Sequence, residues 1–546
     1  MISKLPKSSL PYYKQLLAFD EYLSHNCTFD LKKGEVIGDP DLFWESVYKV
    51  MPLYEKLSTT GEIDDQRMDS LISMLRNGLR MYRFELSKQK KNFDKDSSHS
   101  LKNHKFHLSN SLKQLTDEIL RNPTIGVSAA GVANLFKAYK DLEFVDEAVN
   151  FWEKGKEIPR LKPVFNSETV LGSVIQFLVD TGDFDLSEVD QIYDQIKKGK
   201  SKIIEEEPEV HSELMIGMIK AYLAKGDNER AGNLFKQITT DVCKEYEELA
   251  MDVPPNVLSY MTKAHFAFVC YSTDTNTADM FFESAAKGQL PYPTPLLLSF
   301  IKPYMLNSWV ADGSLTKVRY IWEKTWLFNE KAKRSNSSIS SSLNDLFFKI
   351  FFAKYPKCDA EGVQTLKNVI KSYSNIRAMD EPFFNCLLVN SSVWANTKVF
   401  KTILKAADLY NFQKTNVFYR CCLKSSGAVN LQVSEVHGLV ESLLNSNVAL
   451  GYKKIANADW LAIRDATINS ENPTNQKIDY YFKLWKVCSP YFAEVSNYSS
   501  YQRADIKLNK AYAYIYKNIR EIDASEIQLP QLDFFTKDES LEQRVS

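Results

Sequence analysis

The chain has 546 residues, of which only 19 are Gly and 19 are Pro, and this low content of turn-forming residues argues against strand-rich folds and doubly wound sheets. Its 68 Lys and Arg against 69 Asp and Glu give a formal net charge of -1, which by itself does not indicate a basic nucleic-acid-binding protein. No apolar run approaches the roughly 18 residues of a membrane-spanning helix. The eight cysteines include no CxxC pair, as expected in a reducing compartment.

Residues 1–117 are predicted to form an N-terminal helical region. Apolar stripes at helical spacing run through residues 66–88 and 107–121. Between them, residues 86–113 hold seven lysines against two aspartates, a local charge of +5, and we expect a basic, polar loop there. Three histidines fall in this loop, but no Cys or suitable carboxylate is near to complete a zinc site, so we expect them to be loop residues. They are His99, His104 and His107.

Residues 118–334 carry a repeat. A small or apolar residue is followed at +3, +4 and usually +7 by an apolar, an aromatic and another small or apolar residue, which is one stripe of an α-helix. The aromatic residues are Trp152, Tyr193, Phe235, Phe282 and Trp322, at intervals of 41, 42, 47 and 40 residues. A second apolar helix and a short polar turn usually precede each stripe. We therefore predict an all-α fold, an α-solenoid of stacked antiparallel helical pairs. The alternative is that unrelated amphipathic helices share this spacing by chance.

Residues 335–520 are predicted to form a basic C-terminal helical region without the clean repeat. Serines at 335–342 are expected to form a short loop and helix cap. Residues 396–520 hold 17 Lys or Arg against nine Asp or Glu, a local charge of +8, together with many aromatic residues such as Tyr480, Tyr481 and Trp485. Basic and aromatic side chains together suit single-stranded RNA, although aromatics at helical spacing also suit a core. The acidic tail, residues 521–546, is expected to be partly disordered.

The sequence contains no catalytic constellation. It has no P-loop, GxGxxG, HExxH or GxSxG string, and its seven histidines are scattered. We therefore predict a protein that is not an enzyme and that needs no metal or other cofactor.

Two strings resemble pentatricopeptide repeats. They are MIGMIKAYLAKGDNERAGNLFKQI at 215–238 and the looser VANLFKAYKDLEFVDEAVNFWEKGKE at 132–157. The resemblance implies a stack of helical pairs whose first helices face a single RNA strand. The base-reading position of that superfamily falls on Ile216 and Ala133, which cannot hydrogen-bond a base edge. The one-repeat-one-base code is therefore not expected to apply.

Four further strings resemble a fungal mitochondrial mRNA-stability family named for being required for meiotic nuclear division. They are LLAFDEYL at 16–23, LRNGLR at 75–80, DEPFFNCLL at 380–388 and IANADWLAIRDAT at 455–467, in matching order and spacing. The resemblance implies a matrix protein, peripheral to the inner membrane, that binds AU-rich elements at the 3′ ends of mitochondrial mRNAs. It also implies protection or definition of those ends and delivery of the mRNA to the mitochondrial ribosome. A targeting peptide is not evident at the start of this chain.

Candidate contacts follow from the repeats and from these strings. Lys137 and Lys220 occupy equivalent places on two first helices. The candidates for phosphate contact are Lys137, Lys220, Arg76, Arg80 and Arg83. The candidates for reading or positioning bases are Asn77, Asn385, Asn457 and Arg464. The structural alternatives are helix capping for Asn77 and a surface ion pair for Arg464. The rival function is a tetratricopeptide-like scaffold that binds proteins, such as a factor associated with the mitochondrial ribosome.

Overall fold

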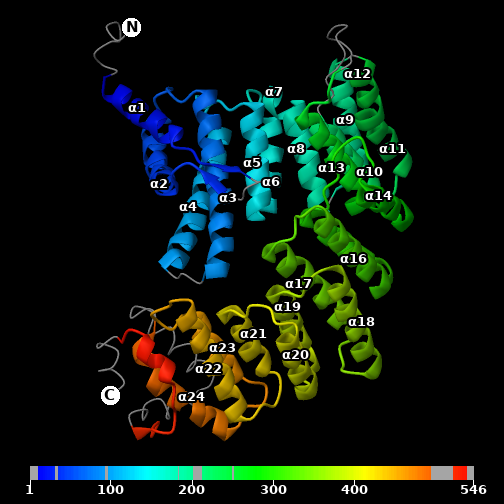
Figure 1. Cartoon of the computed structure of the whole chain (residues 1–546). Coiled ribbons are helices and arrows are strands. Elements are labelled where there is room, and N and C mark those ends of the chain that lie inside the picture. Colours follow the sequence, from blue (N-terminus) through cyan, green and yellow to red (C-terminus); the bar gives the residue numbers. More distant parts are fainter. Residues whose placement is uncertain are drawn as a thin grey trace. The chain divides into compact units, whose positions relative to one another are not determined.

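The structure is a computed structural model of the whole chain, and it describes residues 10–30, 35–92, 96–182, 184–200, 212–248, 251–492 and 521–537. Helices make up nearly all of the secondary structure of these residues (Figure 1). The exception is a small antiparallel hairpin in which Thr28–Asp30 (β1) pairs with Glu35–Ile37 (β2). The prediction of a helical solenoid is confirmed. The chain divides into two compact units between Thr294 and Pro295, a point inside the predicted repeat region 118–334.

Unit 1 begins with α1 (Leu10–Ser24) and α2 (Pro40–Leu57) and continues as helical pairs. The first helices of its pairs are α3 (Asp65–Asn92), α5 (Ala129–Leu142), α8 (Glu168–Thr181), α10 (Ser212–Ala224) and α13 (Pro255–Tyr271). The second helices are α4 (Asp96–Arg121), α6 (Val145–Glu157), α9 (Leu186–Lys200), α11 (Asn228–Lys236) and α14 (Thr275–Lys287). The short elements between them are α7 (Lys162–Phe165), a π-helical turn (Gln237–Asp241) and α12 (Val242–Glu248). Each first helix packs on the next, so the first helices form a continuous row.

Unit 2 repeats the same plan. Its first helices are α15 (Leu298–Asp312), α17 (Ser337–Lys354), α19 (Glu381–Ser391), α21 (Asn416–Ser426) and α23 (Asn457–Ala466). Its second helices are α16 (Leu315–Lys331), α18 (Ala360–Ile376), α20 (Thr397–Leu409), α22 (Val433–Ala449) and α24 (Asn475–Cys488). Short 3₁₀ turns lie at Ser392–Trp394, Ser489–Tyr491 and Pro530–Phe534. The paired helices thus continue to residue 488, past residue 334, where the clean sequence repeat stops.

Local sequence determines where the helices of a pair meet. At the KGD turn, Gly226 takes φ +81°, a left-handed conformation that glycine adopts without steric cost. The next residue, Asp227, caps α11 by accepting a hydrogen bond from the Arg230 backbone amide at 3.0 Å. Asp274 caps α14 in the same way, and Ser128 caps α5. Each turn thus ends one helix and starts the next within a few residues.

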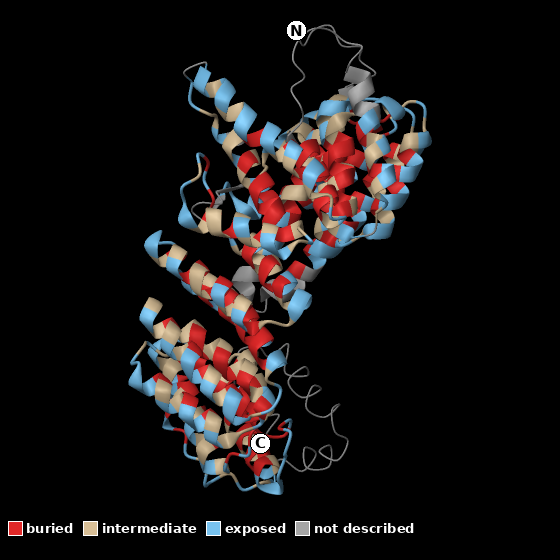
Figure 2. Ribbon diagram, turned by 90° about the vertical axis from the view of Figure 1, so that its right-hand side faces the viewer, coloured by how far each residue is buried: buried red, intermediate tan, exposed pale blue. Residues whose placement is uncertain are grey.

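The predicted stripes form the core between stacked pairs (Figure 2). Their aromatic residues lie on the second helices α6, α9, α11, α14 and α16. Trp322, for example, is fully buried and stacks on Phe347 of the next first helix, with ring centroids 4.4 Å apart. Burying a side chain of this size contributes about 2–3 kcal/mol of hydrophobic free energy. Since each pair buries its stripe against its neighbour, the pairs stabilise one another.

The segment expected to be a basic loop is mostly helical. Within residues 86–113, α3 continues to Asn92 and α4 begins at Asp96. His104 is 8% exposed and its ring stacks on Trp44 at 3.8 Å, while its Nδ1 lies 2.9 Å from the Tyr48 hydroxyl. His107 contacts the Val47 carbonyl oxygen through Nε2 at 3.2 Å. The expectation of loop histidines is therefore wrong for these two residues, whose rings fill the α2–α4 interface as aromatic core. The side chain of His99 is outside the described residues.

The described part of the acidic tail is also ordered. Leu529, Leu532 and Phe535 are each 6% exposed, and the 3₁₀ turn Pro530–Phe534 packs on α22. The Thr536 backbone amide donates to the Lys453 carbonyl oxygen at 2.9 Å. Apolar burial thus holds residues 521–537 in place despite their acidic composition. Residues 538–546 lie outside the described part of the chain.

Candidate nucleic-acid interface

Four polar side chains recur at one position of the first helices α3, α5, α8 and α10, and Lys263 lies about one turn nearer the start of α13. Together they form the basic row: Arg80, Lys137, Gln176, Lys220 and Lys263. Three of them begin the triplets Lys-Ala-Tyr, Lys-Ala-Tyr and Lys-Ala-His at 137, 220 and 263. In each triplet the alanine is buried, at Ala138, Ala221 and Ala264. Since each first helix packs on the next, one charged or amide side chain per helix lies along the row.

Cross-helix contacts place Arg80 beside Lys137. One turn before Arg80, Arg76 donates from Nη1 to Asn134 Oδ1 at 2.5 Å. One turn after it, Arg83 pairs with Asp141 at 2.6 Å. On α5, Asn134 lies about one turn before Lys137 and Asp141 about one turn after it. Arg80 and Lys137 therefore lie opposite each other on adjacent helices. Arg80 is exposed and pairs with no acid within the part of the chain that the structure describes.

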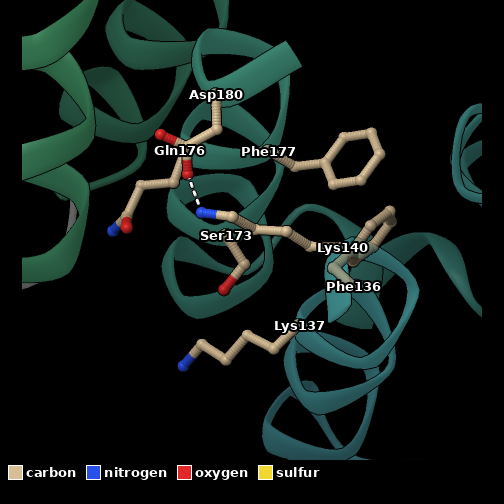
Figure 3. Close-up of a pocket in the computed structure, with 7 residues that line it drawn as sticks. All are labelled: Phe136, Lys137, Lys140, Ser173, Gln176, Phe177 and Asp180. Atoms are coloured by element: carbon tan, nitrogen blue, oxygen red, sulfur yellow. Dashed lines mark hydrogen bonds and ion pairs between the residues drawn. The ribbon is translucent and has the colours of Figure 1, made fainter. Parts of the chain in front are cut away.

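A small recess lies between α5 and α8 in the same row (Figure 3). Its volume is about 60 Å³, and Lys137 and Lys140 extend from α5 toward Ser173, Gln176 and Asp180 on α8. The recess is large enough for ordered water or for one phosphate oxygen, but not for a drug-sized ligand. Its lining offers donors from two lysines and an amide, which suits a passing phosphodiester.

Asp180 joins four successive first helices through its carboxylate. It pairs with Lys140 of α5 and accepts a hydrogen bond from the Tyr271 hydroxyl of α13, and its Oδ1 lies 3.5 Å from Lys220 Nζ of α10. Burial tends to raise the pKa of Asp180, but Lys220 and Lys140 hold it below its usual value. Burial lowers the pKa of Lys220 despite the attraction of Asp180. The Lys220 side chain is only 16% exposed, so its charge is compensated within the protein.

The remaining N-terminal candidates, Asn77 and Arg83, also lie on α3. Asn77 donates from Nδ2 to Asn26 Oδ1 at 3.1 Å and does not cap a helix. Arg83 also donates to the Asp141 carbonyl oxygen. The structure thus brings Arg76, Arg80 and Arg83 together with Lys137 on α5. Asn77 contacts Asn26 instead, and Lys220 lies two helices further along the row.

The C-terminal candidates do not form one cluster. Asn385 lies on α19 and donates to Glu381 at 3.2 Å, whereas Asn457 and Arg464 lie on α23. Helix α21 packs on both α19 and α23 and lies between them. The aromatic residues Tyr480, Tyr481 and Trp485 are buried in the core of unit 2. Their role is structural, as the alternative interpretation of their spacing predicted.

The positions expected to read bases in a pentatricopeptide repeat are buried as well. Ile216 and Ala133 are each 2% exposed and belong to the core of unit 1. Gln176 and Lys263 are not among the candidates that the sequence offers, although the Lys-Ala-aromatic triplet is a usable signal for Lys263. Gln176 could be placed only from the packing of α8 between α5 and α10.

Comparison with known proteins identifies the family. Three family models, described as the RMD9 N-terminal, middle and C-terminal domains, match residues 5–170, 186–413 and 449–541. RNA-binding protein RMD9, mitochondrial, of Saccharomyces cerevisiae is 30% identical over 484 residues, which are 86% of this chain and 72% of that protein. The chain belongs to the RMD9 family. This agrees with the resemblance seen in the four sequence strings.

Other members of the RMD9 family are longer than the matched region. The RMD9-like protein of S. cerevisiae is 33% identical over 440 residues, and that of Candida glabrata is 31% identical over 481 residues. The chain spans 57% and 62% of these two relatives, and they match 80% and 84% of this chain. All three relatives are named as mitochondrial RNA-binding proteins.

A solved structure of the RMD9 family has the same fold. It is described as yeast Rmd9p in complex with a 16-nucleotide target RNA. It aligns with a TM-score of 0.74 at 29% identity, covering 94% of this chain and 98% of the solved one. In the described part of this chain, no helix is both long and apolar enough to cross a membrane. The described residues also contain no group of three or more His, Cys, Asp or Glu able to hold a metal ion.

Two of the RMD9-like strings hold the fold of unit 2 together. In DEPFFNCLL, Asp380 caps α19 through the Phe383 amide at 3.1 Å and accepts from Ser340 Oγ at 3.1 Å. In IANADWLAIRDAT, the buried Asp459 accepts from Arg420 Nε at 2.5 Å and from Asn447 Nδ2 at 3.0 Å. Part of the family resemblance in unit 2 therefore comes from residues that join adjacent helices.

Proposed function

We propose that this protein binds single-stranded RNA in mitochondria along the first helices of unit 1. The observation that carries the proposal is the alignment, over nearly the whole chain, with a family member solved with RNA bound. The basic row supports it, because one cation or amide per helix suits a phosphodiester strand that crosses the helices in turn. The net charge of -1 does not oppose this function, since acidic and basic residues are segregated along the chain.

We extend the proposal to the RNA and to the biological role. The RNA is an AU-rich element at the 3′ end of mitochondrial mRNAs, and binding stabilises the transcript or helps define its end. The protein acts by binding and not as an enzyme. It supports translation by bringing the mRNA to the mitochondrial ribosome, from a matrix location peripheral to the inner membrane. These statements rest on the resemblance to the RMD9 family and on the names of the relatives.

Salt-dependent binding tests the proposal. The probe is a 16-nucleotide single strand of A and U, the length of the RNA in the Rmd9p complex, with the matching duplex for comparison. For three phosphate contacts, the logarithm of the affinity should fall with a slope of about -2 against log salt between roughly 50 and 200 mM. The duplex should bind more weakly at every salt concentration. The proposal would be contradicted if this protein, even at low salt, bound the single strand no more tightly than a control protein of equal charge does. That result would favour the protein scaffold.

A further inference from the structure

A second, larger cleft lies beside the basic row in unit 1. The α3–α5 cleft has a volume of about 600 Å³, within the usual range for ligand sites. It is lined by the N-terminal half of α3, including Asp65, Gln66 and Asp69, together with Asn26 and Asn134. Its lining contains carboxylates, amides and hydroxyls but no Lys or Arg. The cleft therefore repels a phosphate group while offering hydrogen bonds to a neutral polar ligand.

The exposed stripe of α3 changes character along the helix. Gln66, Asp69 and Ser73 line the cleft, and Arg76 and Arg80 follow on the same face at helical spacing. The neutral and acidic half thus borders the basic row directly. A nucleotide has the same division, with an anionic phosphate and a neutral base edge. A strand whose phosphates follow the basic row can therefore place a base in the cleft.

Asn134 connects the two halves. Its Oδ1 accepts a hydrogen bond from Arg76 Nη1 at 2.5 Å, and because a guanidinium only donates, the oxygen must face the arginine. The Nδ2 group of Asn134 then has two hydrogens to donate, and it has no partner among the described residues. Both oxygens of Asp69 already accept from Ser128, which leaves Asp65 as the less engaged carboxylate. Donors and acceptors therefore stand side by side in the cleft, as the edge of a nucleobase requires.

We propose that the α3–α5 cleft binds one unstacked base of the RNA strand and that Asn134 and Gln66 contact its edge. This inference rests on the proposed function and makes the cleft a specificity site of the same interface. It also explains how the chain can prefer a sequence although Ala133 and Ile216 are buried. The base-reading position has moved from the buried side of the first helix to its exposed stripe.

The test combines protein variants with single abasic sites along the 16-nucleotide A and U strand. Asn134→Asp keeps the acceptor for Arg76 and removes both donors. Asn233→Asp makes the same charge change at an exposed site on the second helix α11 and serves as the matched control. Gln66→Ala changes an exposed residue that makes no contact with Arg76, so it tests the cleft independently.

We expect one abasic position to weaken binding by wild type about tenfold, the loss of one or two good hydrogen bonds. In Asn134→Asp and Gln66→Ala, the abasic site at that position should weaken binding by less than about threefold. Abasic sites at the other positions should have the same effect as in wild type. Two outcomes would overturn the inference. In one, each abasic site weakens binding equally in wild type and in both variants. In the other, no abasic site weakens binding by wild type. Absence of RNA binding by wild type at low salt would instead overturn the proposed function itself.

Discussion

Lys220 Nζ lies 3.5 Å from Asp180 Oδ1, on the next first helix, and both side chains are largely buried, at 16% and 10% exposed. Replacing Asp180 by Asn keeps the acceptor for Tyr271 but leaves the Lys220 ammonium without its counter-charge. Removing one partner of a buried pair typically costs about 3 kcal/mol or more. We therefore expect Asp180→Asn to lower the free energy of unfolding by about 3 kcal/mol in urea denaturation.

The chain offers a matched control for this substitution. Asp141 occupies the equivalent place on α5 and pairs with Arg83, whose side chain is 51% exposed. Asp141→Asn should cost less than about 1 kcal/mol, because exposed ion pairs contribute little. Adding Lys220→Met to Asp180→Asn should recover much of the loss. Equal effects at the two aspartates would show that burial of the Asp180–Lys220 pair is not what stabilises the row.

Neutralising the basic row should weaken RNA binding without changing stability. Lys137→Gln and Lys263→Gln each remove one cation from a first helix, and Lys263 is exposed, with its Nζ 5.0 Å from the Tyr260 ring. Each change should reduce the salt slope of RNA binding by about 0.7, the contribution of one phosphate contact on a single strand. Lys154→Gln on the exposed face of α6 is the control and should leave the slope unchanged. Unaltered slopes in both row variants would remove them from the interface.

The sequence predicted the helical pairs where their packing residues had a distinctive type. An aromatic at +4 marked five second helices, but in α18, α20 and α22 the equivalent positions hold Ile370, Leu404 and Val440. Aliphatic residues bury an apolar stripe equally well, so the pairs continue while the visible signature disappears. The sequence therefore shows fewer repeats in unit 2 than the structure does.

The candidate site was predictable only in part, for a related reason. The lysines at one helical position can be aligned from the sequence. Whether each is exposed or paired depends on the acidic residues of the neighbouring helix, which only the fold brings near. Lys220 meets Asp180, whereas no acid pairs with the equivalent Arg80 within the described ranges. The α3–α5 cleft joins residues about 60 positions apart, such as Asp69 and Ser128, and no local pattern indicates that contact.

The buried pair between Arg420 and Asp459 should be important for the stability of unit 2. Asp459 is 1% exposed and also accepts from Asn447 Nδ2 and the Ala456 amide. Asp459→Ala removes the buried carboxylate that accepts from the Arg420 guanidinium and from two further donors, so we expect a loss of about 4 kcal/mol in the free energy of unfolding. In thermal denaturation of the full chain, this loss would appear as an unfolding transition at a lower temperature. Lys401→Ala is the control. It removes the ion pair between Lys401 and Glu435, whose side chains are 47% and 35% exposed, and should lower the free energy of unfolding by less than about 1 kcal/mol.

Acid should destabilise the N-terminal part of unit 1 through His104. Burial lowers its pKa to about 4, with a smaller effect from His107, whereas an unfolded histidine titrates near pH 6.5. Below about pH 6.5 the unfolded chain therefore binds a proton that the folded chain excludes, and stability falls as the pH falls toward 4. The loss from this residue alone is about 2 kcal/mol at pH 5.

A His104→Gln variant tests this in urea denaturation. It should lose correspondingly less stability than wild type between pH 7 and 5, although it is less stable at pH 7 because the stack on Trp44 is gone. His25→Gln is the comparison, because its ring is half-buried and contacts Ser46 at 2.9 Å. Parallel stability curves for His104→Gln and wild type would show that the ring at the α2–α4 interface can be protonated without cost, contrary to its burial against Trp44.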